Sequence, residues 1–491
     1  MPIKFKKLRE AATVTIILAF TNTGMLSQAT AQTKNPTLAV IPAGFNFPTP
    51  GYVIQQWITN AGSSDTTVSA AGLKNIRDHG WDLWNGMTQM TVGLKWGLKM
   101  QMTGISSGGA TIAEIEVPIW TTWPDQTQAL KPIFSKSGAS ELLFELSQET
   151  AMRRPKQFKH LKKAEVKAKA DTAAAPEIVY TLETERFNRT WVISANTPQI
   201  VPFGQGIYSI LGKANIDNYA NDFPASYSPG AKAILDFDAR AIETKPVYYA
   251  LKSKGTSIMP YWQGTSSSAT TNTTNPVPET WKTCVIIDAE NTATTGMRVA
   301  TANEQNGAYA APGLQCASYL YAPIGMVFVQ SLTALEAAAF EGQPDIKAGD
   351  FGALMAMHVN SKETDSWTWQ TFYWQGDPSF ETNSPGSLEG QPSSLGAPWS
   401  SYAMCTAYDQ SYDRGATMNL CYNPYLETSP GIPDGIQSNC VSCHGSANVA
   451  AQGTENPPSY PSNYDKLIDF GGSEFKGVMK TDFSWTIADQ Q

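Results

Sequence analysis

Apolar residues recur at helical spacing near the start of the chain. In residues 69–87, "SAAGLKNIRDHGWDLWNGM", they fall on one face of a helix, and Ser69 is suited to cap its N-terminus. Residues 91–102 and 112–120 alternate apolar and polar side chains, as strands do, and residues 138–152 again show helical spacing. The pattern predicts helix, strands and helix in that order, with a first helical face made of Leu73, Ile76, Gly80, Leu83, Trp84 and Met87.

The pattern changes after a basic and Ala-rich segment at residues 153–176. Most of its cations lie in residues 153–169, which is typical of a solvated loop, with a docking patch for an acidic partner as the alternative. Segments rich in β-branched and aromatic residues follow, and one helix is predicted in "SLTALEAAAFE", residues 331–341. The expected strands are at residues 177–193, 245–251, 283–289 and 367–375.

The resulting fold class is α+β, β-rich and loop-rich. Gly, Pro, Ser and Asn dominate the last hundred residues, so we expect an irregular C-terminal region. A chain of 491 residues exceeds the roughly 250–300 residues of a single core. We predict a signal peptide at 1–31, an N-terminal α+β region at 32–152, a linker or loop at 153–176, a β-rich region at 177–400 and a C-terminal region at 401–491 packed on the rest.

The first 31 residues have the pattern of a cleaved secretory signal. Four cations precede an apolar run at residues 11–20, and the small-residue A-x-A site ends at Ala31. Ten apolar residues are too few for a bilayer core of ~30 Å, which needs about 20. The sequence therefore predicts a periplasmic or otherwise exported protein with no membrane span in the mature chain.

Composition narrows the class of partners. The net charge is −8, and it becomes more negative when the basic leader is removed. Nucleic-acid binding depends on Lys and Arg that neutralise phosphates, so an acidic exported chain is not expected to bind nucleic acid.

Six cysteines are present, and four of them stand alone in the sequence. An even set in an oxidising compartment predicts disulfides, and proximity along the chain favours Cys284 with Cys316 and Cys405 with Cys421. Four cysteines allow three connectivities, and free buried thiols are the alternative.

The other two cysteines belong to the most informative stretch, "SNCVSCHGSANVAA", residues 438–451. The spacing C-x-x-C-H is that of c-type haem attachment, in which Cys440 and Cys443 form thioethers and His444 binds the iron. A zinc site would need further paired ligands, which the scattered histidines and cysteines do not provide. A redox dithiol would need a strand before the motif, and the preceding Pro- and Gly-rich residues do not predict one. Chance occurrence is the remaining alternative.

Several side chains are candidates for the second axial position of one covalent haem c. His358 follows Met355 and Met357 in a strand-like run, and Met479 lies in the short tail. His79 is a weaker candidate, and an open position is the alternative. Trp367, Trp369, Phe372 and Trp374 follow His358 and could pack on a porphyrin, although such an aromatic stripe is also typical of an ordinary core. An axial methionine would raise the reduction potential relative to histidine, and an open position would permit ligand binding.

Several short motifs resemble those of an uncharacterised family of large bacterial exported "cytochrome c family" proteins with a single C-x-x-C-H near the C-terminus. The motifs are "HGWDLWNGMT", "ERFNRT", "HVNSKE" with "WTWQTF", "CYNPYLE", "SNCVSCH" and "KTDFSW". The resemblance would cover most of the mature chain. It implies a haem-containing periplasmic protein without implying a reaction, and it draws attention to His358 and Lys362 of "HVNSKE".

Three classes of function remain open at this point. The first is periplasmic electron transfer with an unknown redox partner, which leaves the large size of the chain unexplained. The second is a haem enzyme, peroxidase-like or acting on a small organic substrate, with an acid/base group over an open iron position. The third is a structural or sensing component of a periplasmic assembly.

Overall fold

The computed structural model has one large compact unit, Pro36–Gln491, to which everything below belongs. The expected signal segment, the basic segment 153–169 and His160 lie outside the described residues. The described residues are 39–96, 106–107, 110–130, 133–134, 142–143, 181–196, 199–200, 207–208, 213–222, 234–262, 278, 281–377, 386–413, 417–427, 439–454, 458 and 467–488.

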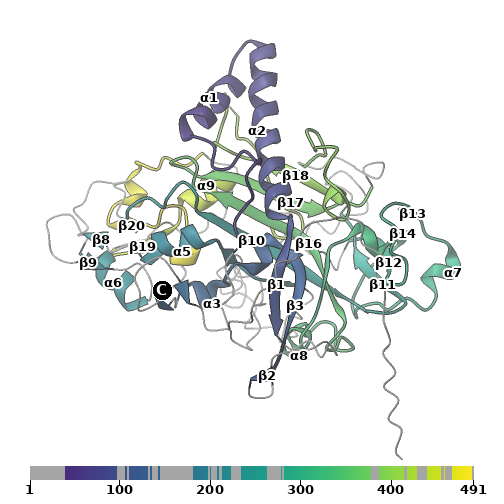
Figure 1. Cartoon of the computed structure of the whole chain (residues 1–491). Coiled ribbons are helices and arrows are strands. Elements are labelled where there is room, and N and C mark those ends of the chain that lie inside the picture. Colours follow the sequence, from purple (N-terminus) through teal and green to yellow (C-terminus); the bar gives the residue numbers. More distant parts are fainter. Residues whose placement is uncertain are drawn as a thin grey trace, which may run out of the picture. The chain divides into compact units, whose positions relative to one another are not determined.

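A seven-stranded antiparallel sheet forms the centre of the unit (Figure 1). Its main path runs β18-β17-β16-β10-β6, with β15 also paired to β16 and β7 to β10. The strands are β6 Thr181–Glu183, β7 Arg186–Phe187, β10 Ile242–Leu251, β15 Val329–Ser331, β16 Phe351–Ser361, β17 Thr368–Trp374 and β18 Tyr402–Thr406.

One face of this sheet, here called the helix face, packs against α2, Thr66–Met87. Trp84 of α2 stacks on Phe372 of β17 with ring centroids 4.1 Å apart. An added Cβ on Gly80 would lie 2.7 Å from the sulfur of Met404 on β18, so the glycine allows the helix to approach the sheet closely. Large apolar side chains therefore fill this side.

The opposite side, here called the motif face, has a different composition. Side chains alternate between the two faces along a strand, so Trp369 and Thr371 point away from the face that carries Phe372. The register places His358 beside Thr371 and Lys245, and Asn360 beside Trp369 and Glu243. Cys405 is the next neighbour of Thr371. Polar and charged residues thus line the motif face.

A second sheet, in the order β11-β12-β14-β13, contains the disulfide Cys284–Cys316. Its strands are β11 Thr256–Pro260, β12 Thr283–Asp288, β13 Arg298–Val299 and β14 Ser318–Pro323. The smaller sheets consist of β1 Met90–Trp96 with β3 Ala110–Pro118 and β2 Ser106–Ser107, then β4 Ile133–Phe134 with β5 Leu142–Leu143, β8 Gln199–Ile200 with β9 Ile207–Tyr208, and β19 Asn448–Ala450 with β20 Val478–Lys480.

The other α-helices of the described residues are short. They are α1 Gly51–Ala61, α3 Gln126–Ala129, α5 Arg189–Asn196, α6 Lys213–Asn221, α7 Ala302–Gln305, α8 Ala334–Ala339, α9 Cys440–Gly445 and α10 Trp485–Ala488. Figure 1 shows the C-terminal part, in yellow, with α9 close to the strands of the central sheet.

The α+β class is confirmed, and so are the helix ending at Met87, the helix in 331–341 and the strands expected around 245–251, 283–289 and 367–375. Asp65 rather than Ser69 caps α2, since the Asp65 carboxylate accepts the backbone N–H groups of Thr67 and Val68. Both predicted disulfides are present.

Two predictions about secondary structure were wrong. Leu142 and Leu143, expected in a helix, form β5, because a short apolar run fits either element and here pairs with β4. The segment 177–193 contains the strands β6 and β7 as expected, but its last five residues begin the helix α5. The Asn188 side chain caps this helix by accepting the N–H of Trp191 at 2.9 Å. With α6, this makes the region after residue 177 richer in helix than expected.

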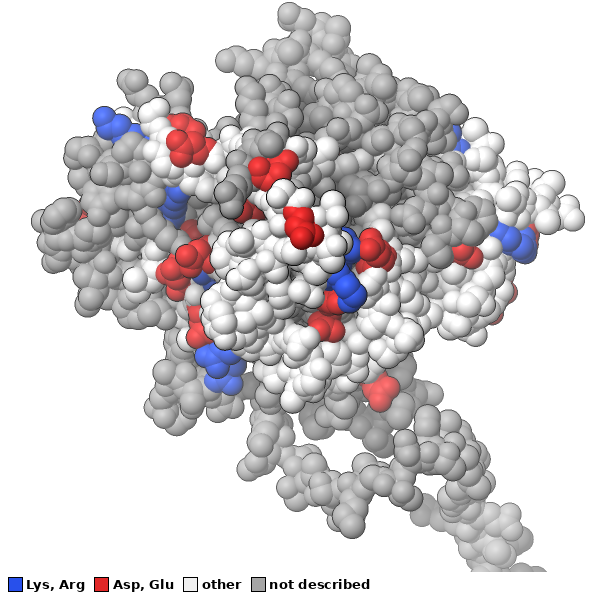
Figure 2. All heavy atoms as spheres, turned by 90° about the horizontal axis from the view of Figure 1, so that it is seen from above, with Lys and Arg blue, Asp and Glu red and all other residues white. Residues whose placement is uncertain are grey.

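No helix among the described residues is long and apolar enough to span a membrane. The face seen from above in Figure 2 carries Lys and Arg interspersed with Asp and Glu over its described part. Arg77 and Glu389 form an ion pair at 2.6 Å.

Candidate functional site

The C-x-x-C-H motif forms most of the short helix α9. Asn439 caps the helix by accepting the Ser442 N–H at 3.0 Å, and its amide donates to the carbonyls of Asp409 and Asn419, each at 2.9 Å. Asn439 is fully buried. The motif itself is helical and anchored to the loop that follows β18.

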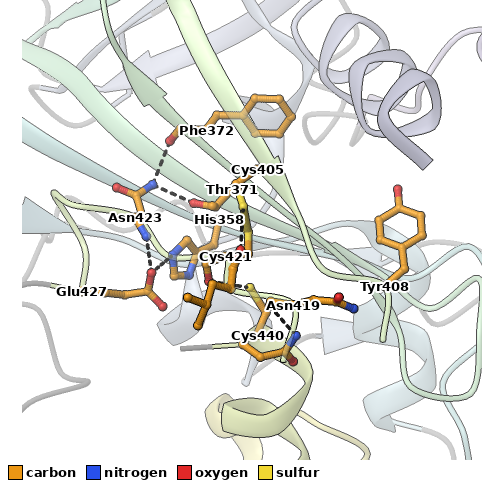
Figure 3. Close-up of a disulfide and its surroundings, with 12 residues drawn as sticks. His358, Thr371, Phe372, Cys405, Tyr408, Asn419, Cys421, Asn423, Glu427 and Cys440 are labelled. Atoms are coloured by element: carbon orange, nitrogen blue, oxygen red, sulfur yellow. Dashed lines mark hydrogen bonds and ion pairs between the residues drawn. A yellow bond between two sulfur atoms is a disulfide. The ribbon is translucent and has the colours of Figure 1, made fainter. Parts of the chain in front are cut away.

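The two cysteines of the motif are not joined to each other. Cys440 is buried, and its sulfur lies 3.7 Å from the carbonyl oxygen of Cys421. Cys421 is linked to Cys405 on the motif face (Figure 3). The second disulfide therefore ties the segment that contacts α9 to the edge strand β18.

Neither thiol has the electrostatic environment of a redox dithiol. Burial, followed by the charges of Glu427 and Cys443, raises the pKa of Cys440 well above its usual value. Burial and Glu427 also raise the pKa of Cys443 to about 12. Reactive dithiols need a lowered pKa at the attacking sulfur. The dithiol interpretation is therefore disfavoured.

His444 has one ring nitrogen fixed by the backbone. Nδ1 lies 3.0 Å from the carbonyl oxygen of Phe483, and the ring packs against Trp369 with centroids 4.2 Å apart. Burial lowers the pKa of His444 to about 3, so the imidazole is neutral at pH 7 and Nδ1 carries the proton that it donates. Nε2 is then the nitrogen with a free lone pair, as a metal-binding histidine requires.

The backbone that supplies this carbonyl has unusual torsions. Asp482 and Phe483 have φ angles of 49° and 66°, and Trp367 has a φ of 62°. Non-glycine residues in this region are strained, and such residues concentrate at functional sites. The three are the non-glycine positive-φ residues of the described chain, and all lie close to His444 or to the Lys362–Asp482 pair.

A buried ion pair holds the strained turn. Lys362 Nζ lies 2.8 Å from Asp482 Oδ1, and Asp482 Oδ2 accepts the Phe237 N–H at 3.0 Å. The two charged side chains are 4% and 0% exposed. Lys362 also donates to the carbonyl of Asp365 at 2.9 Å. The pair thus fixes the residue next to the carbonyl that orients His444.

His358 lies on the motif face, in the middle of the central sheet. Its Nε2 is buried without a hydrogen-bond partner and lies 3.8 Å from Glu427 Oε2 (Figure 3). His358 is also close enough to His444 to help lower the pKa of that residue. The structure therefore brings together the motif histidine and the leading sequence candidate for a second ligand.

The other candidates have different surroundings. Met479 is fully buried on β20 and belongs to the same apolar cluster as Cys440 and Trp369. His79 of α2 has both ring nitrogens engaged, Nδ1 with the Tyr408 hydroxyl at 2.6 Å and Nε2 with Glu363 at 3.1 Å. His79 is satisfied within a buried network and has no nitrogen left to bind iron.

Sequence reasoning missed a cluster of buried acids beside the motif. Thr486 lies 3.0 Å from Glu185 Oε2 and 3.2 Å from Glu243 Oε1, and both carboxyls are buried. Lys245 lies 3.2 Å from Glu183 and 3.8 Å from Glu185. Glu243 and Lys245 are two positions apart in the strand β10, which could have indicated that both lie on one polar face. No local pattern links them to Thr486.

A cavity of about 350 Å³ adjoins the C-terminal end of α9. Its walls include Gly445 and Phe483 of the site, together with Phe470, Lys480, Asp236 and Asp365. The cavity therefore lies next to the strained turn and combines aromatic and charged side chains.

Several of the motifs quoted from the sequence contact one another, and one of them contacts α9. Trp485 of "KTDFSW" donates its Nε1–H to the Cys443 carbonyl at 3.3 Å, and Asn423 of "CYNPYLE" donates to Thr371 at 2.7 Å. "ERFNRT" supplies Glu185, while "HVNSKE" supplies His358 and Lys362. Glu363 links the same segment to His79 of "HGWDLWNGMT".

The residues around α9 fit a covalent haem better than a zinc ion. His444 has a fixed Nδ1 and an available Nε2, two free thiols precede it, and His358 has an orphaned buried nitrogen. Within the described chain, no three His, Cys, Asp or Glu side chains are grouped as a metal ion would need. Comparisons with protein-family models, curated proteins and solved structures found no match.

Proposed function

We propose that this chain is an exported c-type haem protein that carries electrons in the periplasm. Cys440 and Cys443 would bind one haem covalently, and His444 would bind its iron through Nε2. The observation that carries the proposal is the hydrogen bond of His444 Nδ1 to the Phe483 carbonyl, directly after two free cysteines. Such a bond at the second ring nitrogen is typical of histidines that bind metals.

When bound, the haem would supply one-electron redox chemistry. The chain's own residues would orient the iron ligand and limit the access of water to the haem. The Phe483 carbonyl orients the His444 ring, and Trp369 covers one side of it. Cys440 is buried, which limits access of water. His358 is the best-placed second ligand because its Nε2 has no hydrogen bond to lose.

Export is proposed on three grounds. The first 31 residues have the pattern of a secretory signal. The disulfides Cys284–Cys316 and Cys405–Cys421 are typical of an oxidising compartment. Covalent haem attachment in bacteria also takes place on the exported side of the membrane. The redox partner is a protein of unknown identity.

The test is covalent haem staining of the full chain on a denaturing gel. The wild type should stain, and Cys440→Ala with Cys443→Ala should lose the stain because both thioethers are gone. Each single variant should stain more weakly. The matched control is Cys284→Ala with Cys316→Ala, which removes the same number of sulfurs from the second sheet and should keep the stain. Staining that survives the loss of both motif cysteines would contradict the proposal.

A haem enzyme is the second candidate, and the cavity beside Gly445 and Phe483 favours it. Such an enzyme needs a position on the iron that a substrate can reach. An absorption spectrum of the reduced protein with and without carbon monoxide separates the two functions. A spectrum that carbon monoxide leaves unchanged supports the carrier, whereas ready binding supports the enzyme.

A further inference from the structure

Tyr408, two residues after β18, belongs to a buried hydrogen-bond network with His79 of α2 and with Glu363. The Tyr408 hydroxyl lies 2.6 Å from His79 Nδ1, and His79 Nε2 lies 3.1 Å from Glu363 Oε1. Tyr408 is 0% exposed, His79 2% and Glu363 3%, so the hydrogen bonds of the network are shielded from solvent. The network is separate from the residues proposed to bind the iron.

The hydrogen bonds around Glu363 fix the tautomer of His79. The Glu363 carboxylate accepts the Thr49 N–H at 2.5 Å on one oxygen and the Ser361 hydroxyl on the other, so both oxygens are acceptors. A neutral imidazole has one N–H group and one lone pair. His79 therefore donates from Nε2 to Glu363, and the lone pair on Nδ1 accepts the Tyr408 O–H.

The phenol proton of Tyr408 thus has a base within reach. A further neighbour of the phenol oxygen is the Thr368 hydroxyl, which can donate to it. A hydroxyl does not hold an added proton at ordinary pH, whereas an imidazole does. Burial, followed by the charge of Glu363, raises the pKa of Tyr408 well above its usual value, so the phenolate does not form by itself. An electron that leaves Tyr408 must therefore be accompanied by transfer of the proton to Nδ1.

The segment that carries Tyr408 also contacts the proposed site of haem attachment. The carbonyl of Asp409 accepts a hydrogen bond from Asn439, the cap of α9, at 2.9 Å. The Tyr412 hydroxyl accepts the Tyr408 N–H at 3.2 Å. Burial raises the pKa of Tyr412, and the nearby Asp409 and Cys440 raise it further. Tyr412 is therefore close to Tyr408 and to Cys440, which are both drawn in Figure 3.

From this geometry we infer that Tyr408 is a redox-active tyrosine, a second one-electron site whose phenol proton is taken up by His79. The oxidant in the cell is a haem that has been oxidised by a hydroperoxide, so the inference rests on the haem of the proposed function. The hydroperoxide takes two electrons from the haem and two protons from solvent, and it leaves as an alcohol and water.

Tyr408 then returns one of these electrons to the haem. Its O–H bond breaks, an N–H bond forms at His79 Nδ1, and the resulting imidazolium is paired with the Glu363 carboxylate. When a one-electron donor reduces the tyrosyl radical, the proton returns from Nδ1 to the phenol oxygen. The network thus confines the radical to a buried side chain.

The test is electron paramagnetic resonance of the full chain after oxidation by light. A ruthenium(II) tris-bipyridine complex with a cobalt(III) electron acceptor is converted by a flash to ruthenium(III), a strong one-electron oxidant. The sample is held at pH of about 9, where the neutral form of imidazole prevails. The spectrum is recorded at a delay, after radicals on exposed side chains such as Tyr52, which is 79% exposed, have recombined. The wild type should show a tyrosyl radical.

Variants assign the signal, because the chain has 19 tyrosines. Tyr408→Phe should remove most of the tyrosyl signal. His79→Gln should slow the formation of the radical by about 100-fold, because an amide is not a base and a positioned base speeds proton transfer by about 10²–10⁴-fold.

The matched control is Tyr402→Phe. Tyr402 is also fully buried, but its hydroxyl donates to the Leu354 carbonyl at 2.8 Å and accepts the Phe328 N–H at 3.3 Å. A carbonyl does not take up the phenol proton. This variant should therefore keep the full tyrosyl signal.

The outcomes separate the inference from the proposed function, because the added oxidant needs no haem. A signal that is retained in Tyr408→Phe, or lost to the same extent in Tyr402→Phe, overturns the inference. A wild type without a tyrosyl signal, or an unchanged rate in His79→Gln, also overturns it and leaves the proposed function standing. A chain that forms the Tyr408 radical but lacks covalent haem overturns the proposed function and the oxidant named above, and supports the redox-active tyrosine.

If Tyr408→Phe does not fold, the wild type decides by itself. Its histidines are labelled with a nitrogen isotope, and the radical is measured by pulsed electron paramagnetic resonance. Coupling of the tyrosyl radical to a labelled imidazole nitrogen supports the inference. A tyrosyl radical without this coupling overturns it.

Discussion

The two faces of the central sheet differ in their chemistry. On the helix face, Trp84, Phe372 and Tyr402 pack ring against ring. On the motif face, the same strands carry Glu243, Lys245 and His358, together with Trp369 against His444. Apolar packing stabilises a fold, whereas buried charges cost free energy unless they are paired. The helix face is thus mainly an apolar packing surface, whereas the motif face carries the buried polar groups around the proposed site.

His79, on the helix face, and His444, on the motif face, differ in their hydrogen-bond partners. His79 has a partner at each ring nitrogen, a tyrosine hydroxyl and a carboxylate. His444 has a backbone partner at Nδ1 only. A histidine that is satisfied at both nitrogens holds elements together, while one that is satisfied at Nδ1 alone is ready to bind through Nε2.

The largest expected effects come from removing one tryptophan on each face. Trp84→Ala and Trp369→Ala should each lower the free energy of unfolding by about 3–5 kcal/mol, because each leaves a large cavity. If the proposed haem is bound, only Trp369→Ala should also change its absorption spectrum, since that ring contacts His444. Urea unfolding and absorption spectra of the folded protein check this. Equal spectral changes in both variants would contradict the assignment of the site to the motif face.

Disrupting the buried Lys362–Asp482 ion pair should also lower the free energy of unfolding. Lys362→Met should lower the free energy of unfolding by about 3–5 kcal/mol, because Asp482 is left buried without its cation. Adding Asp482→Asn to this variant should recover part of the loss by removing the unpaired charge. Denaturant unfolding at pH 7 measures both. A loss below about 1 kcal/mol in Lys362→Met would show that the pair does not hold the turn.

Replacing Glu243 in the cluster of buried acids should raise the free energy of unfolding by an amount that depends on pH. The pKa of Glu243 is raised from 4.5 to about 8 in the folded chain, so the folded state holds its proton more tightly than the unfolded state. Wild-type stability should therefore fall as the pH rises from 4.5 through 8. Glu243→Gln removes this loss and should be more stable than the wild type by about 5 kcal/mol at high pH. At pH 4 the two should be alike. Parallel unfolding curves at pH 4 and pH 9 measure the difference, and an equal difference at both would contradict it.

Features formed by consecutive residues could be predicted from the sequence, whereas contacts between distant residues could not. The strands β10, β12 and β17 are runs of β-branched and aromatic residues, and C-x-x-C-H needs only five consecutive positions. Thr486, in contrast, meets Glu185 and Glu243 across 301 and 243 positions. Contacts of this kind depend on strand register and on the positive φ angles at Asp482 and Phe483, of which the one at Phe483 is unfavourable for a bulky side chain.

His358→Leu should have the smallest effect on stability, and it tests directly whether the motif face supplies a second ligand. The buried Nε2 of His358 has no hydrogen bond, so its removal should change the free energy of unfolding by about 1 kcal/mol or less. If His358 is the second ligand, the same change should convert the haem to a different spin state, visible in the absorption spectrum. His79→Gln is the control from the helix side, where two hydrogen bonds are disturbed and the spectrum should stay as it is. An unchanged spectrum in His358→Leu would assign His358 to the core and leave Met479 or an open position opposite His444.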